Sequence, residues 1–191
     1  MSAYSSAYSS ASDDGSWTPA AYHGIAKVRG TEENKRMVCC AIPYDLKTKN
    51  ILLISSRKKA GLWTLPKGGR EEGEALPAAA LREAWEEGGV RGYIMTEECI
   101  REIATARTRI HFFPLQVSGL LESWPEDTRE REWVTVEEAI SRTYWRPEQA
   151  EALTTFLEWR DQLLGENDQA EDDGLDRLRS FVLLFPYFSC S

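Results

Sequence analysis

The chain has 191 residues, of which 42% are hydrophobic and 28% are charged. This balance is typical of one globular domain with terminal extensions. The formal net charge is −8, from 31 acidic and 23 basic residues, which disfavours general binding to nucleic acids or to anionic membranes. A polyanionic ligand would therefore need a local cluster of cations on an acidic protein.

The cysteines and histidines do not indicate a zinc site. None of the four cysteines forms a CxxC pair, and the two histidines lie far apart along the chain. The N-terminal segment lacks the basic and apolar regions of a signal peptide. We therefore expect a reducing compartment, the cytoplasm or the nucleus, and no membrane association.

The two ends of the chain differ in composition from its middle. Residues 1–20 are rich in Ser, Ala and Tyr and are expected to be a disordered tail. Residues 21–165 are expected to form the folded domain. Residues 166–191 begin with an acidic linker and end with an apolar run that is too short to span a bilayer. We expect this run to dock on the domain, with a membrane or partner contact as the alternative.

Apolar runs separated by turn residues predict the strands in chain order. The expected strands cover residues 26–30, 37–44, 51–56, 92–95, 100–106, 109–121 and 133–135. A short helix is expected over 137–144. A longer helix is expected from Pro147, whose missing N–H suits a first helical turn, to about residue 164. This pattern fits a sheet covered by helices on both faces.

The stretch 67–90 organises the chain, and it predicts a loop, one helix and a stop. Three glycines, at positions 68, 69 and 73, allow a tight loop whose backbone can approach a ligand. The segment after Pro77 is rich in the helix formers Ala, Leu, Arg and Glu. Two glycines at positions 88 and 89 predict the end of the helix.

Three carboxylates on this predicted helix are three or four positions apart and therefore share one side. They are Glu83, Glu86 and Glu87. Like charges at these spacings repel by roughly a few tenths of a kcal/mol per pair. A divalent cation would remove this repulsion, and oxygen-only ligands suit Mg²⁺ first and Mn²⁺ second. The alternative is a solvated acidic helix face without a ligand.

The full spacing of this stretch resembles the Nudix box, Gly-x5-Glu-x7-Arg-Glu-U-x-Glu-Glu-x-Gly-U, in which U is aliphatic. The matching residues are Gly68, Glu74, Arg82, Glu83, Glu86, Glu87, Gly89 and Val90. Ala84 is smaller than the usual aliphatic residue at the first U, which is a mild departure. The resemblance implies an α+β fold, an α/β/α sandwich with a mixed central sheet. It also implies a hydrolase that acts on a nucleoside diphosphate linked to another group.

The resemblance assigns roles within the box. The implied metal ligands are Glu83, Glu87 and the main-chain carbonyl of Lys67. Glu86 is implied as the proton acceptor for the attacking water, with Glu87 as the alternative. Arg82 and Glu74 are implied to pair and to brace the loop against the helix. Mg²⁺, or else Mn²⁺, is the implied cofactor.

Two further stretches are similar to diphosphoinositol polyphosphate phosphohydrolases. They are ILLISSRKKAGLWTLPKGG, at residues 51–69, and LESWPEDTREREWVTVEEAI, at residues 121–140. Lys67 before the glycines looks more like the fungal members. The similarity implies that the substrates are diphosphoinositol polyphosphates, diadenosine polyphosphates or inorganic polyphosphate. The candidate substrate-binding residues are Arg29, Lys35, Arg36, Ser56, Arg57, Lys58, Gly68, Gly69, Arg107, Arg109, Arg129 and Arg146.

Most of these candidates are cations, as a densely phosphorylated ring requires. Arg107 and Arg109 are two positions apart on a predicted strand and are expected to face the same way. The alternative functions are hydrolysis of another nucleoside diphosphate derivative, mRNA decapping, and non-catalytic sensing of inositol phosphates. Intact box carboxylates argue against a sensor, and the lack of a basic face argues against decapping. We expect a monomer whose partner is a small polyphosphate, without nucleic acid.

Overall fold

The computed structural model of the chain describes residues 9–11, 17–19 and 35–162. The predictions for the strand over 26–30, for Arg29, for the acidic linker and for the apolar run lie outside the described residues. Strands β1 (Ser9–Ala11) and β2 (Trp17–Pro19) pair antiparallel within the segment that was expected to be a disordered tail.

The predicted elements of the main domain are present, with shifts of a few residues at their ends. Its helices and strands are β3 (Arg36–Tyr44), β4 (Ile51–Ser55), β5 (Trp63–Thr64), β6 (Lys67–Gly69), α1 (Leu76–Gly88), β7 (Val90–Ile94), β8 (Arg101–Ala104), β9 (Thr108–Leu120), β10 (Arg131–Val134) and α2 (Val136–Arg142). A further helix begins at residue 147, and its described part runs to residue 162. No helix in the described part of the chain is long and apolar enough to cross a membrane.

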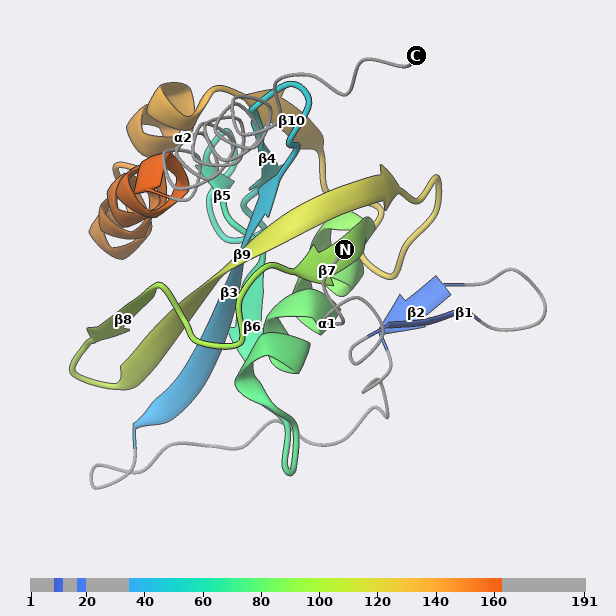
Figure 1. Ribbon diagram of the computed structural model, residues 1–191, viewed down its shortest axis with the longest axis horizontal. Coiled ribbons are helices and arrows are strands. Elements are labelled where there is room, and N and C mark those ends of the chain that lie inside the picture. The colour runs from blue at the N-terminus through green and yellow to red at the C-terminus, as the bar shows by residue number, and fades with distance from the viewer. Residues whose placement is uncertain (1–8, 12–16, 20–34, 163–191) are drawn as a thin grey trace, which may run out of the picture. The chain divides into compact units, whose positions relative to one another are not determined.

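The main sheet has eight strands and is mixed, as predicted. Its central order is β10-β4-β3-β9-β7, with β5, β6 and β8 paired to β4, β3 and β9. The pairing of β3 with β9 is parallel, from Arg36 beside Thr108 to Tyr44 beside Gln116. The other pairs in this sheet are antiparallel. Figure 1 shows β3 and β9 side by side at the centre, with α1 against them.

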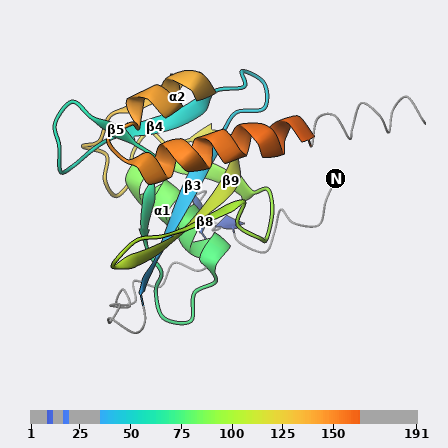
Figure 2. The ribbon, with the colours of Figure 1, turned by 90° about the vertical axis from the view of Figure 1, so that its left-hand side faces the viewer.

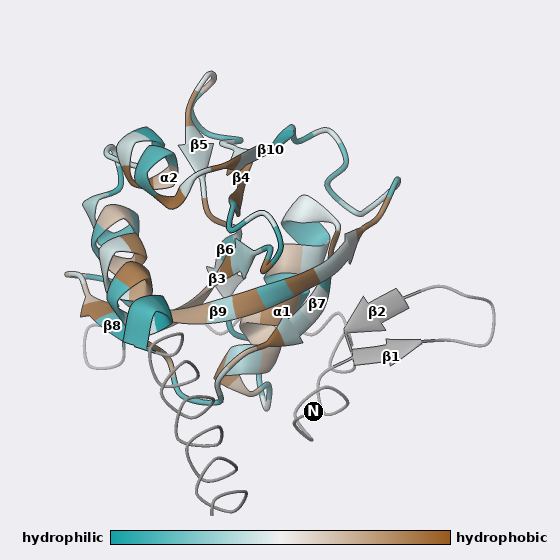
Figure 3. Ribbon diagram, turned by 45° about the horizontal axis from the view of Figure 1, so that its top comes forward, coloured by the Kyte–Doolittle hydropathy of each residue, from teal (hydrophilic) through white to brown (hydrophobic). Residues whose placement is uncertain are grey.

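Alternating residues of β3 serve the two faces of the sheet, as the two-residue period of a strand requires. Cys39 and Ala41 lie in the core cluster with the alanines of α1. On the opposite face, the Tyr44 ring contacts the Phe156 ring of the helix from residue 147, with centroids 5.1 Å apart. Figure 2 shows this helix and α1 on either side of the sheet, and Figure 3 shows hydrophobic and hydrophilic residues following one another along β9. The predicted α/β/α sandwich is therefore confirmed.

The glycine segment differs from the prediction of a simple loop. Residues Lys67–Gly69 form the short strand β6, and Gly68 lies opposite Cys39 in the pairing with β3. The tight turn comes later, at Gly73, whose φ of 75° lies in the left-handed region. The predicted stop of α1 is confirmed at Gly89, which has a φ of 61° and donates its N–H to Trp85 O at 2.9 Å.

Candidate active site

Arg82 is the buried centre of the box. Its guanidinium makes two bonds to the carboxylate of Glu74, from Nε at 2.8 Å and from Nη2 at 3.0 Å, and Nη2 also donates to Gly69 O at 3.0 Å. The Arg82 side chain is fully buried and Glu74 is 3% exposed. The geometry therefore joins the turn before α1, the strand β6 and the helix itself, as expected from the brace between Arg82 and Glu74.

Each of the three box carboxylates on α1 pairs with an arginine. Arg82 Nη1 lies 3.0 Å from Glu83 Oε1 and 3.2 Å from Glu86 Oε2. Arg129 Nη1 lies 2.7 Å from Glu87 Oε1. The repulsion that the sequence pattern suggested is therefore relieved by two arginines of the chain itself. A divalent cation must compete with these arginines for the carboxylates.

Gly68 explains why β6 can lie so close to α1. A Cβ at this position would stand 1.9 Å from Glu83 Oε1 and 2.1 Å from Glu83 Oε2. The missing side chain thus makes room for the Glu83 carboxylate against the main chain of β6. One helical turn later, Glu87 Oε2 accepts a hydrogen bond from the N–H of Lys67 at 2.9 Å. Two carboxylates of α1 therefore converge on the peptide units around Lys67.

This arrangement fits a hard divalent cation in its chemistry. The oxygens that converge here are those of the Glu83 and Glu87 carboxylates, and carboxylate oxygens are ligands that Mg²⁺ and Mn²⁺ prefer. Within residues 35–162 and the two short strands, no group of three His, Cys, Asp or Glu side chains is arranged to hold a metal ion. The ligand set of Glu83, Glu87 and the Lys67 carbonyl therefore stays a prediction.

Burial changes the ionisation of two groups in this region. It raises the pKa of Glu87 above its ordinary value of 4.5, and Arg129 and the Lys67 N–H oppose the rise. It lowers the pKa of the Lys67 ammonium below 10.5, with the nearby Cys40 and Glu87 opposing and Arg146 adding to the effect. Both charged groups are therefore held in a poorly solvated place, where a bound ion of opposite charge is stabilising.

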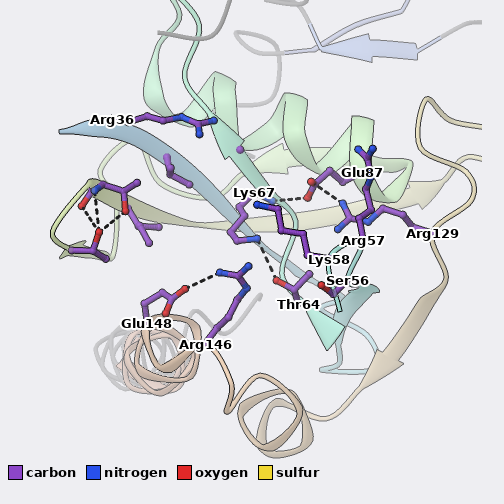
Figure 4. A pocket seen from close by; sticks show the side chains of 15 residues that line it. Arg36, Ser56, Arg57, Lys58, Thr64, Lys67, Glu87, Arg129, Arg146 and Glu148 are labelled. Carbon is purple, nitrogen blue, oxygen red and sulfur yellow. Dashed lines mark hydrogen bonds and ion pairs between the residues drawn. The ribbon is translucent and has the colours of Figure 1, made fainter. Parts of the chain in front are cut away.

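A cavity of about 750 Å³ opens beside the C-terminal part of α1, which carries Glu87 (Figure 4). Its wall contains cations from separate parts of the chain, together with two carboxylates, Glu87 and Glu148. These cations are Arg36, Arg57, Lys58, Lys67, Arg129 and Arg146. The wall therefore carries an excess of positive charge, although the whole chain carries −8.

Of the candidate substrate-binding residues, those that line the cavity are Arg36, Ser56, Arg57, Lys58, Gly68, Arg129 and Arg146. Lys35 is outside the wall, and its ammonium donates to Thr105 O at 2.7 Å. Gly69 is also outside, because the guanidinium of Arg36 lies over it, with Nη2 2.6 Å from where a Cβ would be. Lys35 and Gly69 therefore do not line the cavity, although each lies next to a residue that does.

Arg107 and Arg109 do not share a strand face, and this expectation is wrong. Strand β9 begins at Thr108, so Arg107 lies in the bend before it. The cavity wall contains Thr105, Thr108 and Ile110, whereas Arg109 pairs with Glu102 at 3.0 Å. Residues 108 and 110 share one face of β9, which puts Arg109 on the other.

Glu86 also lies outside the wall, whereas its neighbour Glu87 lines it. The Glu86 carboxylate pairs with Arg82, and the Glu86 carbonyl accepts the N–H of Glu126 at 3.0 Å. The two residues named for proton transfer therefore have different surroundings. Glu87 faces the cavity, and Glu86 faces the buried arginine.

Aromatic residues beside the cavity rim were not predicted from the sequence. Trp145 is fixed by a 2.8 Å hydrogen bond from its Nε1 to Trp63 O. The Arg146 guanidinium lies 4.4 Å from the centre of the Trp145 ring, and the Lys59 ammonium lies 5.1 Å from it. Arg146 Nε is buried and has no hydrogen-bond partner among the residues that the structure describes. The run Tyr-Trp-Arg-Pro at 144–147 was a signal that could have pointed to this cluster.

Fold and site together define a box helix that holds carboxylates at the edge of a cationic cavity. Residues 34–156 of the chain match the NUDIX domain family. The chain therefore belongs to the NUDIX domain family. Nudix hydrolases act on small molecules and generally use divalent metal ions such as Mg²⁺.

Individual relatives show several kinds of Nudix protein. The chain is 40% identical over 132 residues to Nudix hydrolase 21, chloroplastic, of Arabidopsis thaliana, covering 62% of this chain and 66% of the relative. It is 34% identical over 109 residues to human diphosphoinositol polyphosphate phosphohydrolase 2, covering 56% and 61%. The alignments thus span less than two thirds of the length of these curated relatives.

A solved structure supports the fold. The crystal structure of a C. elegans Ap4A hydrolase in a binary complex matches with a TM-score of 0.54 at 20% identity. The match covers 65% of this chain and 98% of that one. At this identity the likeness concerns the fold alone.

Proposed function

We propose that the chain is a metal-dependent phosphoanhydride hydrolase that removes the β-phosphate of diphosphoinositol polyphosphates and also cleaves diadenosine polyphosphates. The observation that carries the proposal is the cationic cavity beside the box helix. Its cations come from β3, from the segment after β4, from β6, from the loop before β10 and from the segment before the last helix. A ring with phosphates on all sides would engage cations from all these directions.

One buried donor adds to this argument. Arg146 Nε lacks a partner among the described residues, although buried polar groups are nearly always hydrogen-bonded. The Arg146 guanidinium lies 4.4 Å from the centre of the Trp145 ring, and the planar guanidinium group can bind two oxygens of one phosphate. Arg146 therefore has the setting of a phosphate ligand rather than of a solvated surface charge.

A bound divalent ion would neutralise phosphate charge and lower the pKa of an attacking water. In this proposal Glu83, Glu87 and the Lys67 carbonyl hold that ion. Glu86 accepts the proton of the water, and Glu87, which faces the cavity, is the alternative acceptor. The cations of the wall orient the phosphates and stabilise their charge. Arg82 keeps the box helix against β6 and takes no direct part.

The test is a panel of substrates with Mg²⁺, followed by phosphate release and product mass. A diphosphoinositol polyphosphate should lose its β-phosphate, and a diadenosine polyphosphate should be cut within its phosphate chain. Hydrolysis of another nucleoside diphosphate derivative alone would refute the substrate proposal. Binding of inositol phosphates without turnover on any substrate would indicate a sensor.

Matched variants separate the roles of the carboxylates. Glu86→Gln should lower kcat by at least about 10²-fold with little change in substrate affinity, as for a general base. Glu87→Gln should instead raise the Mg²⁺ concentration needed for half-maximal rate. Near-normal turnover of folded Glu86→Gln, with loss of turnover in Glu87→Gln at saturating Mg²⁺, would give the base role to Glu87.

Substitution of a rim arginine tests the role of the cavity. Arg146→Gln removes a charge-assisted contact worth about 1.5–3 kcal/mol, so kcat/KM should fall by roughly 10- to 100-fold. Arg101→Gln is the control, because Arg101 is half exposed and pairs with Glu151 away from the cavity wall. Equal effects of both changes would show that the cavity is not the binding site.

Several expectations stay predictions. The fungal character, the monomeric state and the location in cytoplasm or nucleus have no support beyond the sequence. The names of two plant relatives carry the words chloroplastic and mitochondrial. Substrate contacts by Arg107 and Arg109 also stay predictions, and the cavity wall does not favour them.

A further inference from the structure

A chain of ion pairs runs from the rim of the cavity to the box carboxylate Glu87. Arg57 Nη1 lies 2.6 Å from Glu126 Oε1, and Glu126 Oε2 lies 3.2 Å from Arg129 Nη1. The same Arg129 nitrogen lies 2.7 Å from Glu87 Oε1. The exposed fraction of the side chains falls along this series of ion pairs, from 66% at Arg57 through 26% at Glu126 to 5% at Arg129. This series of ion pairs therefore links the solvent-exposed cation of Arg57 to the half-buried carboxylate of Glu87.

Two carboxylates share one nitrogen of Arg129, whose two hydrogens can serve both of them. Glu87 has the shorter contact and Glu126 the longer one, and both reach Nη1. Arg129 Nε is held at 3.0 Å by the carbonyl of Ser55, at the end of β4. With Nε held there, a small rotation of the guanidinium would shorten its contact with one carboxylate and lengthen its contact with the other.

Glu126 is fixed in place by its own backbone. Its N–H donates to the carbonyl of Glu86 at 3.0 Å, and its carbonyl accepts the N–H of Arg129 at 3.0 Å. Its side chain therefore cannot leave the region while α1 and the loop stay together. Of its two carboxylate oxygens, one faces the rim and the other faces the buried arginine.

We propose that Glu126 is a positioning residue that draws Arg129 off Glu87 and so clears this carboxylate for a metal ion. A substrate phosphate that binds Arg57 takes this cation from Glu126. The Glu126 carboxylate then has only Arg129 to neutralise it, and Arg129 turns further from Glu87. Phosphate binding and metal binding are thereby coupled, and by linkage each strengthens the other. This inference rests on the proposed metal-dependent hydrolysis.

The test measures Mn²⁺ affinity without substrate, from the electron paramagnetic resonance signal of free Mn²⁺. Arg129→Gln should tighten Mn²⁺ binding about tenfold, because the competing cation is gone. Glu126→Gln should weaken it about fivefold, because Arg129 then belongs to Glu87 alone. In the Arg129→Gln background, Glu126→Gln should change the affinity less than twofold.

The matched control is Glu130→Gln, which removes the same charge from the same loop. In the described part of the chain, the exposed Glu130 side chain makes no hydrogen bond or ion pair with these arginines. It should change Mn²⁺ affinity less than twofold in both backgrounds. If Glu126→Gln weakens binding equally with and without Arg129, its effect is only the lost negative charge, and the inference is overturned. It is also overturned if Arg129→Gln leaves the affinity unchanged.

A second cycle avoids the buried arginine in case its substitution prevents folding. Arg57 is well exposed, so Arg57→Gln is expected to fold. It should tighten Mn²⁺ about threefold by releasing Glu126, and this gain should vanish in the Glu126→Gln background. An equal gain in both backgrounds overturns the coupling. If the wild-type protein hydrolyses substrate but the effects of the paired substitutions on Mn²⁺ affinity simply add in both cycles, only the coupling is refuted. If the wild-type protein neither binds Mn²⁺ nor hydrolyses any substrate, the proposed function is refuted.

Discussion

The contact between Gly68 and Glu83 allows a sharp test of how the box is built. In Gly68→Ala, the new Cβ would lie 1.9 Å from Glu83 Oε1, and the carboxylate must move back by about 1.5 Å to reach the 3.4 Å of ordinary contact. The obstacle is a side chain with little freedom, because Glu83 is 2% exposed and pairs with Arg82 at 3.0 Å. The carboxylate must therefore give up its place between β6 and the buried arginine.

The expected loss of stability follows from two costs and one smaller opposing gain. Overpacking in a buried site costs about 1–3 kcal/mol. Loss of a hydrogen bond to a charged group costs about 1.5–3 kcal/mol. The lower entropy of the unfolded alanine chain returns about 0.4–1 kcal/mol. Urea unfolding should therefore show a free energy of unfolding lower by roughly 2–5 kcal/mol. The Mg²⁺ requirement should rise as well.

The neighbouring glycine supplies the control. In Gly69→Ala the three atoms nearest to the Cβ would belong to the Arg36 guanidinium, the closest at 2.6 Å, and this group is the far end of a flexible side chain. This variant should lose less than about 1 kcal/mol. In a Glu83→Ala background, the Gly68→Ala change should lose most of its effect, because the obstacle is absent. Equal losses at both glycines, or an unchanged loss without Glu83, would refute the reasoning.

Three further outcomes test other parts of the structure. Arg82→Lys should lower the free energy of unfolding by about 3–5 kcal/mol in urea, since a single ammonium cannot reproduce the buried fork, and a loss below about 1 kcal/mol would contradict this. Burial lowers the pKa of His111 below its ordinary 6.5, against the opposing Glu102, so the unfolded state takes up the proton first as the pH falls. Wild-type stability should then drop below pH 6.5 by a component that His111→Gln lacks, and parallel pH profiles would exclude it. Burial raises the pKa of the Cys39 thiol to about 12, and Cys40 is equally buried. Neither thiol should therefore react with Ellman's reagent before the protein unfolds, and prompt labelling of either would show that the core is open.

Local patterns predicted the elements of this fold well. The helix between Pro77 and Gly89, the helix that begins at Pro147 and the apolar strand that ends at Tyr44 all have signals within a few residues of themselves. Such signals depend on the backbone preferences of Gly and Pro and on short-range alternation. They are independent of what the segment later contacts.

Parts of the site depended on contacts that no local pattern contains. Arg107 and Arg109 were expected on one face, but β9 starts one residue later than Arg107, and a strand face is decided by that single step. The pairing of Glu87 with Arg129 joins residues 42 positions apart, one on α1 and the other in the loop before β10. The sequence alone predicted which residues are charged, and the tertiary structure determines which charges meet.

The parallel pairing of β3 with β9 has a consequence for the order in which the chain acquires its structure. The residues of β3 are synthesised about seventy positions before their partners in β9, and the whole box is made between them. Phe113 and Leu115 of β9 belong to the core cluster on which α1 packs. During translation, α1 must therefore wait for β9 before its apolar side is covered, and this long closure slows folding. A ribosome stalled before residue 108 would hold a complete Nudix box that has no finished sheet to rest on.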